Sequence, residues 1–173
     1  MKKEQAIYLF IRYGILVALG FGLEMIYKIF TSLTVYPVYW ILNSLYGGVL
    51  ADNNTILLKG IFIELIPACI AGSAYYLLLI LNLSTSMDIG KRLKNITYLI
   101  FSFLLLNIFR ILVMIWIFFA LYDYFNLTHR VVWYIGSTIM VVVIWFFGVY
   151  IFNIKEIPIY SDIKNIIKDI KKR

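Results

Sequence analysis

An apolar stretch from Ile96 to Leu121, which contains one charged side chain, Arg110, limits the folds open to this chain. Lipid offers no hydrogen-bond partners to a backbone, so an apolar stretch of this length predicts a transmembrane helix. A guanidinium at the centre of such a helix costs roughly 2.5–3.5 kcal/mol on insertion scales, and it usually faces a polar cavity or a partner. Asn107 lies one turn earlier on the same face. The pair therefore indicates a specific role inside the membrane.

The composition places the whole chain in the membrane class. Apolar residues make up 63% of its 173 residues, against roughly 45–50% in soluble domains. The length predicts one domain. The net charge of +7 could suggest nucleic-acid binding, but the basic residues gather near the chain ends and in one short segment. That distribution favours cytoplasmic anchoring, and no nucleic-acid partner is expected.

The hydropathy pattern predicts an all-α polytopic membrane protein with about four transmembrane helices. The expected spans cover Ala6 to Phe30, Ala68 to Leu83, Ile96 to Tyr122 and Val131 to Phe152. The aromatic segment Pro37 to Tyr46 is too short to span, so we expect a short interfacial or re-entrant helix there. Gly47-Gly48 and Asp52-Asn53-Asn54 predict turns, and Thr55 to Leu65 is compatible with a short extended segment.

The distribution of lysine and arginine predicts the orientation. Basic residues cluster on one side of a four-span arrangement, at Lys2, Lys3, Lys91, Arg92, Lys94, Lys155, Lys164, Lys168, Lys171, Lys172 and Arg173. Lys28, Lys59 and Arg130 fall on the other side. Both termini are therefore expected in the cytoplasm. Residues 1–157 would form the membrane-embedded core, and residues 158–173 a basic amphipathic cytoplasmic helix lying on the inner leaflet.

The single cysteine, Cys69, and the single histidine, His129, limit the available chemistry. One cysteine allows neither an internal disulfide nor a thiolate-rich metal site, and one histidine excludes a histidine-rich cluster. No cofactor is predicted. Pro67 favours the first turn of a helix, so Cys69 is expected near a helix amino terminus, where a thiolate is stabilised. His129 is expected at the end of the outer loop before the fourth span.

Cys69, Arg110 and His129 can all be placed on the outer half of the membrane in this arrangement. A thiol, a base and a fixed cation are the groups that cysteine acyl transfer requires. Because Arg110 lies deep in its span, a shared site requires that span to project beyond the membrane. Taken singly, the cysteine is more often an apolar filler, the histidine a solvated side chain, and the arginine can form a structural ion pair with Glu64 or Glu24.

The order and spacing of three motifs resemble the exosortase/archaeosortase family. The motifs are Pro67-Ala68-Cys69 opening a span, Asn107-Ile108-Phe109-Arg110-Ile111 about forty residues later, and His129 after that span, covering about half of the chain. The resemblance implies a membrane-embedded cysteine transpeptidase. It would cut the C-terminal tripartite sorting tails of secreted proteins and transfer the new terminus to a membrane lipid or another acceptor.

The resemblance also implies site residues. Cys69 and Arg110 match the essential residues of the family, whereas the third role falls to His129 or to the adjacent Arg130. Asn107, Gly72, Ser73 and Glu64 would support the site, in an outer-facing polar cleft that Pro37 to Tyr46 partly covers. Many family members have glycine two residues after the cysteine, whereas here the glycine is Gly72. The short chain looks like the short archaeal branch.

Two other classes of function remain open. A non-enzymatic membrane protein, such as a transporter subunit or an assembly factor, would use Arg110 as an ion-pair pivot and would not need Cys69. A lipid-handling enzyme using His129 alone would be equally indifferent to the thiol. The sequence identifies neither the substrate motif nor the acceptor.

Overall fold

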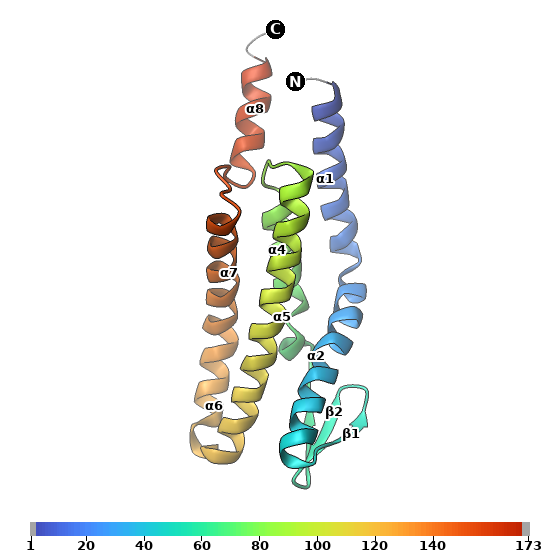
Figure 1. The fold of residues 1–173 in the computed structure, drawn as a ribbon, viewed down its shortest axis with the longest axis vertical. Coiled ribbons are helices and arrows are strands. Elements are labelled where there is room, and N and C mark those ends of the chain that lie inside the picture. Colours follow the sequence, from blue (N-terminus) through green and yellow to red (C-terminus); the bar gives the residue numbers. More distant parts are fainter. Residues whose placement is uncertain (1–2, 171–173) are drawn as a thin grey trace.

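The computed structural model describes residues 3–170 and is mostly helical, at 78%. Three helices are long and apolar enough to cross a membrane, Leu23–Tyr46, Ile89–Ala120 and Tyr122–Ile151, and two shorter apolar helices accompany them. The elements run along the length of an elongated molecule (Figure 1). This confirms a predominantly helical membrane protein. The expected basic residues Lys2, Lys171, Lys172 and Arg173 lie outside the described range.

The first span does not end at Phe30 and is not followed by a separate interfacial helix. Helix α1 (Lys3–Phe21) is followed at Gly22 by helix α2 (Leu23–Tyr46), and the two form one bent column (Figure 1). Pro37 lies inside α2, and the prediction of a short helix from Pro37 to Tyr46 was wrong. The buried positions keep the helical period across the proline, at Thr34, Val38 and Leu42. That continuous packed face holds the helix together.

A small antiparallel sheet follows α2, in the order β1-β2-β3. Its strands are β1 (Val49–Asp52), β2 (Thr55–Leu58) and β3 (Ile61–Glu64). Gly47 ends α2 in the left-handed conformation, with φ +67°, which a glycine adopts without steric cost. The predicted turns are confirmed. The expected extended segment from Thr55 to Leu65 is instead a hairpin, because a turn at Lys59-Gly60 divides it into β2 and β3, and β1 was not predicted. The sheet is an addition to the all-α architecture, and β2 buries its Ile56 and Leu58 side chains.

The expected second span from Ala68 to Leu83 is broken into two pieces. A one-turn helix, α3 (Pro67–Ile70), ends at Ala71, which has φ +58°, and helix α4 (Gly72–Leu83) begins after it. Tyr27 explains why position 72 is small, since a Cβ there would lie 2.8 Å from its ring. At about 1.5 Å per residue, α4 is too short to cross a bilayer. Cys69 therefore lies on the short first piece, α3, and the break at Ala71 separates it from α4.

The fourth apolar segment begins earlier than expected. Helix α5 (Ile89–Ala120) is followed by α6 (Tyr122–Val131), a π-helical turn η1 (Val132–Gly136) and α7 (Ser137–Ile151). His129 was expected to end a loop, but it lies inside α6, and only Leu121 separates α5 from α6. Helices α5 and α6 form a helical hairpin, and Arg110 and His129 line the same pocket.

Helix α8 (Tyr160–Ile170) forms where an amphipathic helix was predicted, but it is tied to the first helix. A guanidinium nitrogen of Arg12 lies 2.6 Å from a carboxylate oxygen of Asp162, and both residues are buried. Tyr13 donates a hydrogen bond to the same carboxylate. In Figure 1, α8 runs along the length of the molecule rather than across it.

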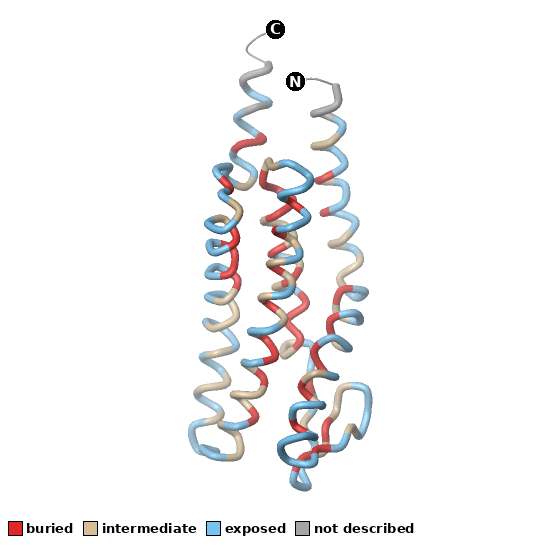
Figure 2. Tube along the Cα trace, in the orientation of Figure 1, coloured by how far each residue is buried: buried red, intermediate tan, exposed pale blue. Residues whose placement is uncertain are grey.

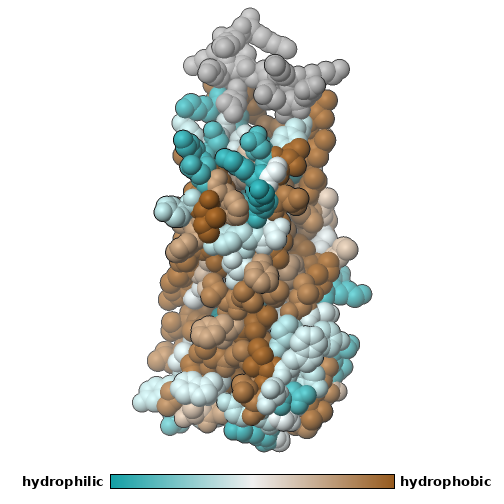
Figure 3. All heavy atoms as spheres, in the orientation of Figure 1, coloured by the Kyte–Doolittle hydropathy of each residue, from teal (hydrophilic) through white to brown (hydrophobic). Residues whose placement is uncertain are grey.

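The distribution of burial agrees with a bundle surrounded by lipid. Buried residues line the inner sides of the helices, and the outward sides are exposed along most of their length (Figure 2). Many of those exposed side chains are large and apolar, such as Phe10, Phe101 and Phe146. Hydrophilic side chains gather toward the end that carries α1 and α8 (Figure 3). A soluble protein rarely exposes so much apolar surface, whereas a membrane-spanning one requires it.

Candidate functional site

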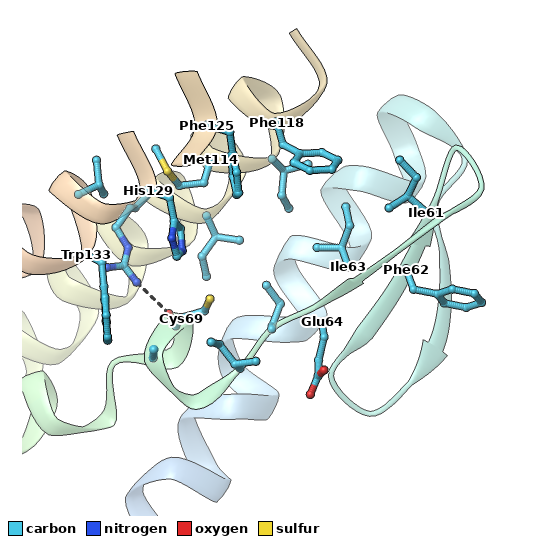
Figure 4. A pocket seen from close by; sticks show the side chains of 17 residues that line it. Ile61, Phe62, Ile63, Glu64, Cys69, Met114, Phe118, Phe125, His129 and Trp133 are labelled. Atoms are coloured by element: carbon cyan, nitrogen blue, oxygen red, sulfur yellow. Dashed lines mark hydrogen bonds between the residues drawn. The ribbon is translucent and has the colours of Figure 1, made fainter. Parts of the chain in front are cut away.

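A pocket of about 260 Å³ contains all three residues expected to perform catalysis. It opens between the sheet, α3, α5 and the α6–η1 region (Figure 4). The lining consists of Ile61, Phe62, Ile63, Glu64, Leu65, Ile66, Ala68, Cys69, Arg110, Ile111, Met114, Ile115, Phe118, Phe125, His129, Val132 and Trp133. The expected polar cleft is therefore mainly apolar, with Cys69, Arg110 and His129 gathered in one part of it. The segment from Pro37 to Tyr46 does not line it, and β3 takes that place.

Cys69 is half-buried and carries a free thiol. Its backbone N–H donates a 2.8 Å hydrogen bond to the Ile66 carbonyl, within the single turn of α3. Figure 4 shows the sulfur at the pocket wall. Because α3 has only four residues, the expected stabilisation of a thiolate by a long helix dipole does not arise from α3. Arg110, which lines the same pocket, is the cationic residue that could stabilise a thiolate.

The break at Ala71 leaves backbone carbonyls that α5 satisfies. The amide nitrogen of Asn107 donates to the carbonyls of Cys69, at 3.0 Å, and Ile70, at 3.3 Å. Arg110 donates to the Cys69 carbonyl as well, at 3.1 Å. Buried carbonyls need such partners. The Asn107–Arg110 pair, expected to point one way from its helix, therefore fixes the backbone of the candidate nucleophile.

Arg110 is anchored by neutral acceptors. One guanidinium nitrogen donates to the hydroxyl of Ser137, at 2.6 Å, and the other to the Cys69 carbonyl. Among the side chains that the structure describes, neither Glu24 nor Glu64 forms an ion pair with it; Glu64 instead accepts a 3.4 Å hydrogen bond from Asn54. Ser137 was missed from the sequence, because nothing in its apolar segment indicates which helix Arg110 faces.

His129 reaches the pocket and Arg130 does not. The imidazole stacks on the Phe125 ring, with centroids 5.4 Å apart and the planes 22° from parallel. Its ring points into the pocket in Figure 4. Arg130 is exposed and is not among the lining residues. Of the two residues that the sequence left open for the third role, the geometry therefore favours His129.

The remaining supporting residues occupy other positions. Gly72 and Ser73 lie beyond the pocket, where the Ser73 backbone N–H donates to the Tyr27 hydroxyl at 3.3 Å. Glu64 lines the pocket, but its carboxylate points away from Cys69 (Figure 4). Within residues 3–170, the structure brings together no group of three or more histidine, cysteine, aspartate or glutamate residues that could hold a metal ion.

Comparison with known proteins adds no assignment to this geometry. No family model matches the chain, and neither a curated protein nor a solved structure matches it. Any assignment of function therefore depends on the pocket and on the motifs in the sequence.

Proposed function

We propose that this chain is a membrane-embedded cysteine transpeptidase that cleaves C-terminal sorting signals of secreted proteins. The observation that carries the proposal is the meeting of Cys69, Arg110 and His129, from three separate elements, in one apolar pocket. The thiol is the only one in the sequence. A resemblance of these motifs to the exosortase/archaeosortase family points to the same activity.

Each of the three side chains has a defined role in the proposed reaction. The Cys69 sulfur attacks the carbonyl carbon of the scissile peptide bond, while His129 accepts the thiol proton. Arg110 stabilises the negative charge that develops; it has five N–H donors, and the hydrogen bonds to Ser137 and Cys69 leave others for the oxyanion. The C–N bond then breaks, and His129 returns the proton to the leaving amine.

The acyl-enzyme formed in this way is a thioester on Cys69. A hydroxyl or amine of a membrane lipid, or of another acceptor, then attacks the thioester carbonyl and releases the thiol. The apolar walls, among them Met114, Phe118 and Phe125, exclude water and so favour transfer over hydrolysis. They also suit the apolar part of a sorting tail. The proposed partners are secreted proteins with such tails and a lipid acceptor.

The activity can be tested by comparing the C-termini of secreted proteins. Cells that carry the gene and cells that lack it are compared by mass spectrometry of C-terminal peptides. We expect a small set of proteins to lose an apolar, basic-ended tail only when the gene is present. Identical C-termini in the two strains, at normal expression of the protein, would exclude the proposed activity.

We further propose four passes through the membrane, with both termini in the cytoplasm and the active site toward the outer face. Because α4 alone is too short to cross, the second pass would consist of α3 and α4 together, from Pro67 to Leu83. Helices α1 and α8 meet at one end through Arg12 and Asp162, and the sheet lies at the opposite end (Figure 1). The basic residues Lys91, Lys94 and Lys155 lie toward the first end, which the positive-inside rule assigns to the cytoplasm.

Reporter fusions at the two termini should both report the cytoplasm. A membrane-impermeant maleimide added to intact cells should label an Asn53→Cys variant in a Cys69→Ala background, because Asn53 lies in the exposed β1–β2 turn. A Lys91→Cys variant in the same background is the matched control and should react only after the cells are opened. A C-terminal reporter outside the cell would overturn this topology.

A further inference from the structure

Within residues 3–170, strand β3 is an edge strand of the sheet, and one row of its backbone groups has no partner strand. It pairs with β2 on one side, in the register Thr55 with Glu64 and Leu58 with Ile61. The Leu65 N–H donates to the Asn54 carbonyl at 2.8 Å, which extends the same ladder. Successive residues of an antiparallel strand direct their backbone N–H and C=O groups to alternate sides. Because Leu65 bonds toward β2, Phe62 and Glu64 direct these groups away from β2.

This open edge borders the candidate active site. Every residue from Ile61 to Ile66 lines the pocket, although neighbouring side chains of a strand point to opposite faces. Figure 4 shows this alternation, with Ile63 turned one way and Phe62 and Glu64 the other. A cavity on the face of a sheet is lined by alternate residues of a strand, whereas a cavity along the backbone edge of a strand is lined by consecutive residues. The consecutive residues found here indicate that the pocket follows the edge of β3. The strand then leads, through Ile66, directly into α3 and Cys69.

We propose that the polypeptide substrate binds as an added strand along the open edge of β3, which delivers its scissile carbonyl to Cys69. This inference rests on the proposed function and names how that site holds its substrate. A peptide main chain presents donors and acceptors in alternation, which is what Phe62 and Glu64 leave unpaired. Recognition through the main chain gives affinity without a fixed side-chain sequence, and side chains turned toward Ile63 and Met114 meet apolar walls.

The probe is N-acetyl-Ala-Val-Ala chloromethyl ketone, which needs no knowledge of the natural recognition motif. The Cys69 sulfur displaces chloride from its methylene carbon, and a thioether forms while the thiol proton is released. Chloroacetone carries the same reactive group without a peptide chain. The intact mass of the protein in lipid nanodiscs reports the alkylation. Because chloromethyl ketones also alkylate histidine, and His129 lines the same pocket, the rate assigned to Cys69 is the part that the Cys69→Ala protein lacks. Each rate is divided by the rate with free glutathione, which removes intrinsic reactivity.

The first comparison removes one N–H from the open edge. Phe62→Pro deletes a donor that β2 does not use, and edge strands tolerate proline. We expect the normalised peptide rate to fall about fivefold, which corresponds to one lost hydrogen bond, while the chloroacetone rate stays unchanged. Phe62→Val keeps the backbone N–H, so its normalised peptide rate should fall less than that of Phe62→Pro. Ala51→Pro places a proline in the opposite edge strand, at a residue without a register partner, and is the matched control.

The second comparison alters the probe and leaves the protein intact, so it remains decisive if Phe62→Pro fails to fold. Probes N-methylated at one of two adjacent amides are compared on the wild-type protein. In an added strand, only every second amide of the probe would bond to β3. Methylation of that amide should slow the reaction about fivefold, and methylation of the adjacent amide should leave the rate unchanged. Equal rates for both probes, or a peptide rate no higher than that of chloroacetone, would overturn the added-strand proposal.

These outcomes are separate from a failure of the proposed function. If Cys69→Ala cells process secreted proteins normally, the transpeptidase proposal falls, whatever the alkylation rates. If processing depends on Cys69 but the peptide rates are insensitive to Phe62→Pro and to N-methylation, the activity stands and the substrate binds in another way.

Discussion

Replacement of Cys69 by alanine should reduce processing of secreted substrates to less than roughly a thousandth of the wild-type rate. A nucleophile has no substitute, because the covalent intermediate forms on its own atom. Cys69→Ser should come close to the same loss, since a hydroxyl is far harder to deprotonate than a thiol and the pocket is largely apolar. The measurement is the fraction of tail-cleaved substrate in cells, at matched protein levels.

The adjacent pair His129 and Arg130 provides the matched control for this prediction. His129 faces the pocket and Arg130 is exposed, although both lie on the same helix. His129→Ala should lower the rate by about a hundredfold or more, as expected for a general acid–base, and Arg130→Ala should leave it near normal. Normal processing by Cys69→Ala would remove the transpeptidase from consideration and leave Arg110 and Asn107 as structural residues.

Arg110→Lys should lower processing by about a hundredfold or more, even though it keeps the positive charge. The guanidinium spans two acceptors on different elements, the Ser137 hydroxyl at 2.6 Å and the Cys69 carbonyl at 3.1 Å. A planar fork holds both at once, whereas a lysine ammonium is a single point of charge. The substitution should therefore misplace the Cys69 backbone and also weaken stabilisation of the oxyanion.

Two further variants separate these contributions. Ser137→Ala removes one hydrogen-bond acceptor of Arg110 and should lower the processing rate less than Arg110→Lys does. Asn107→Ala removes a donor to the Cys69 and Ile70 carbonyls without a change in charge, so its loss of activity would measure the positioning of the backbone alone. All variants are compared for thermal unfolding in nanodiscs. A fully active and stable Arg110→Lys protein would contradict the assignment of Arg110 to the reaction.

Several features were predictable because they depend on local pattern. The apolar segments predicted a helical membrane protein, Gly47 and Asn53 marked turns, and Asn107 with Arg110 marked one polar face. The breaks were not predictable. Nothing in the apolar run shows that the helix stops at Ala71 or that α2 continues past Pro37, because both outcomes depend on packing against other helices.

The sequence by itself determined that the chain belongs in a membrane, and that Arg110 must find polar partners inside it, because burial in lipid is costly for any charge. Only the tertiary structure decided which partners those are. The break at Ala71 exposes the Cys69 carbonyl, and α7 brings Ser137 to the guanidinium. The turns of the sheet were visible in the sequence, but its place beside the pocket was not, because that depends on how β3 lies against α5 and α6, which are distant in the chain.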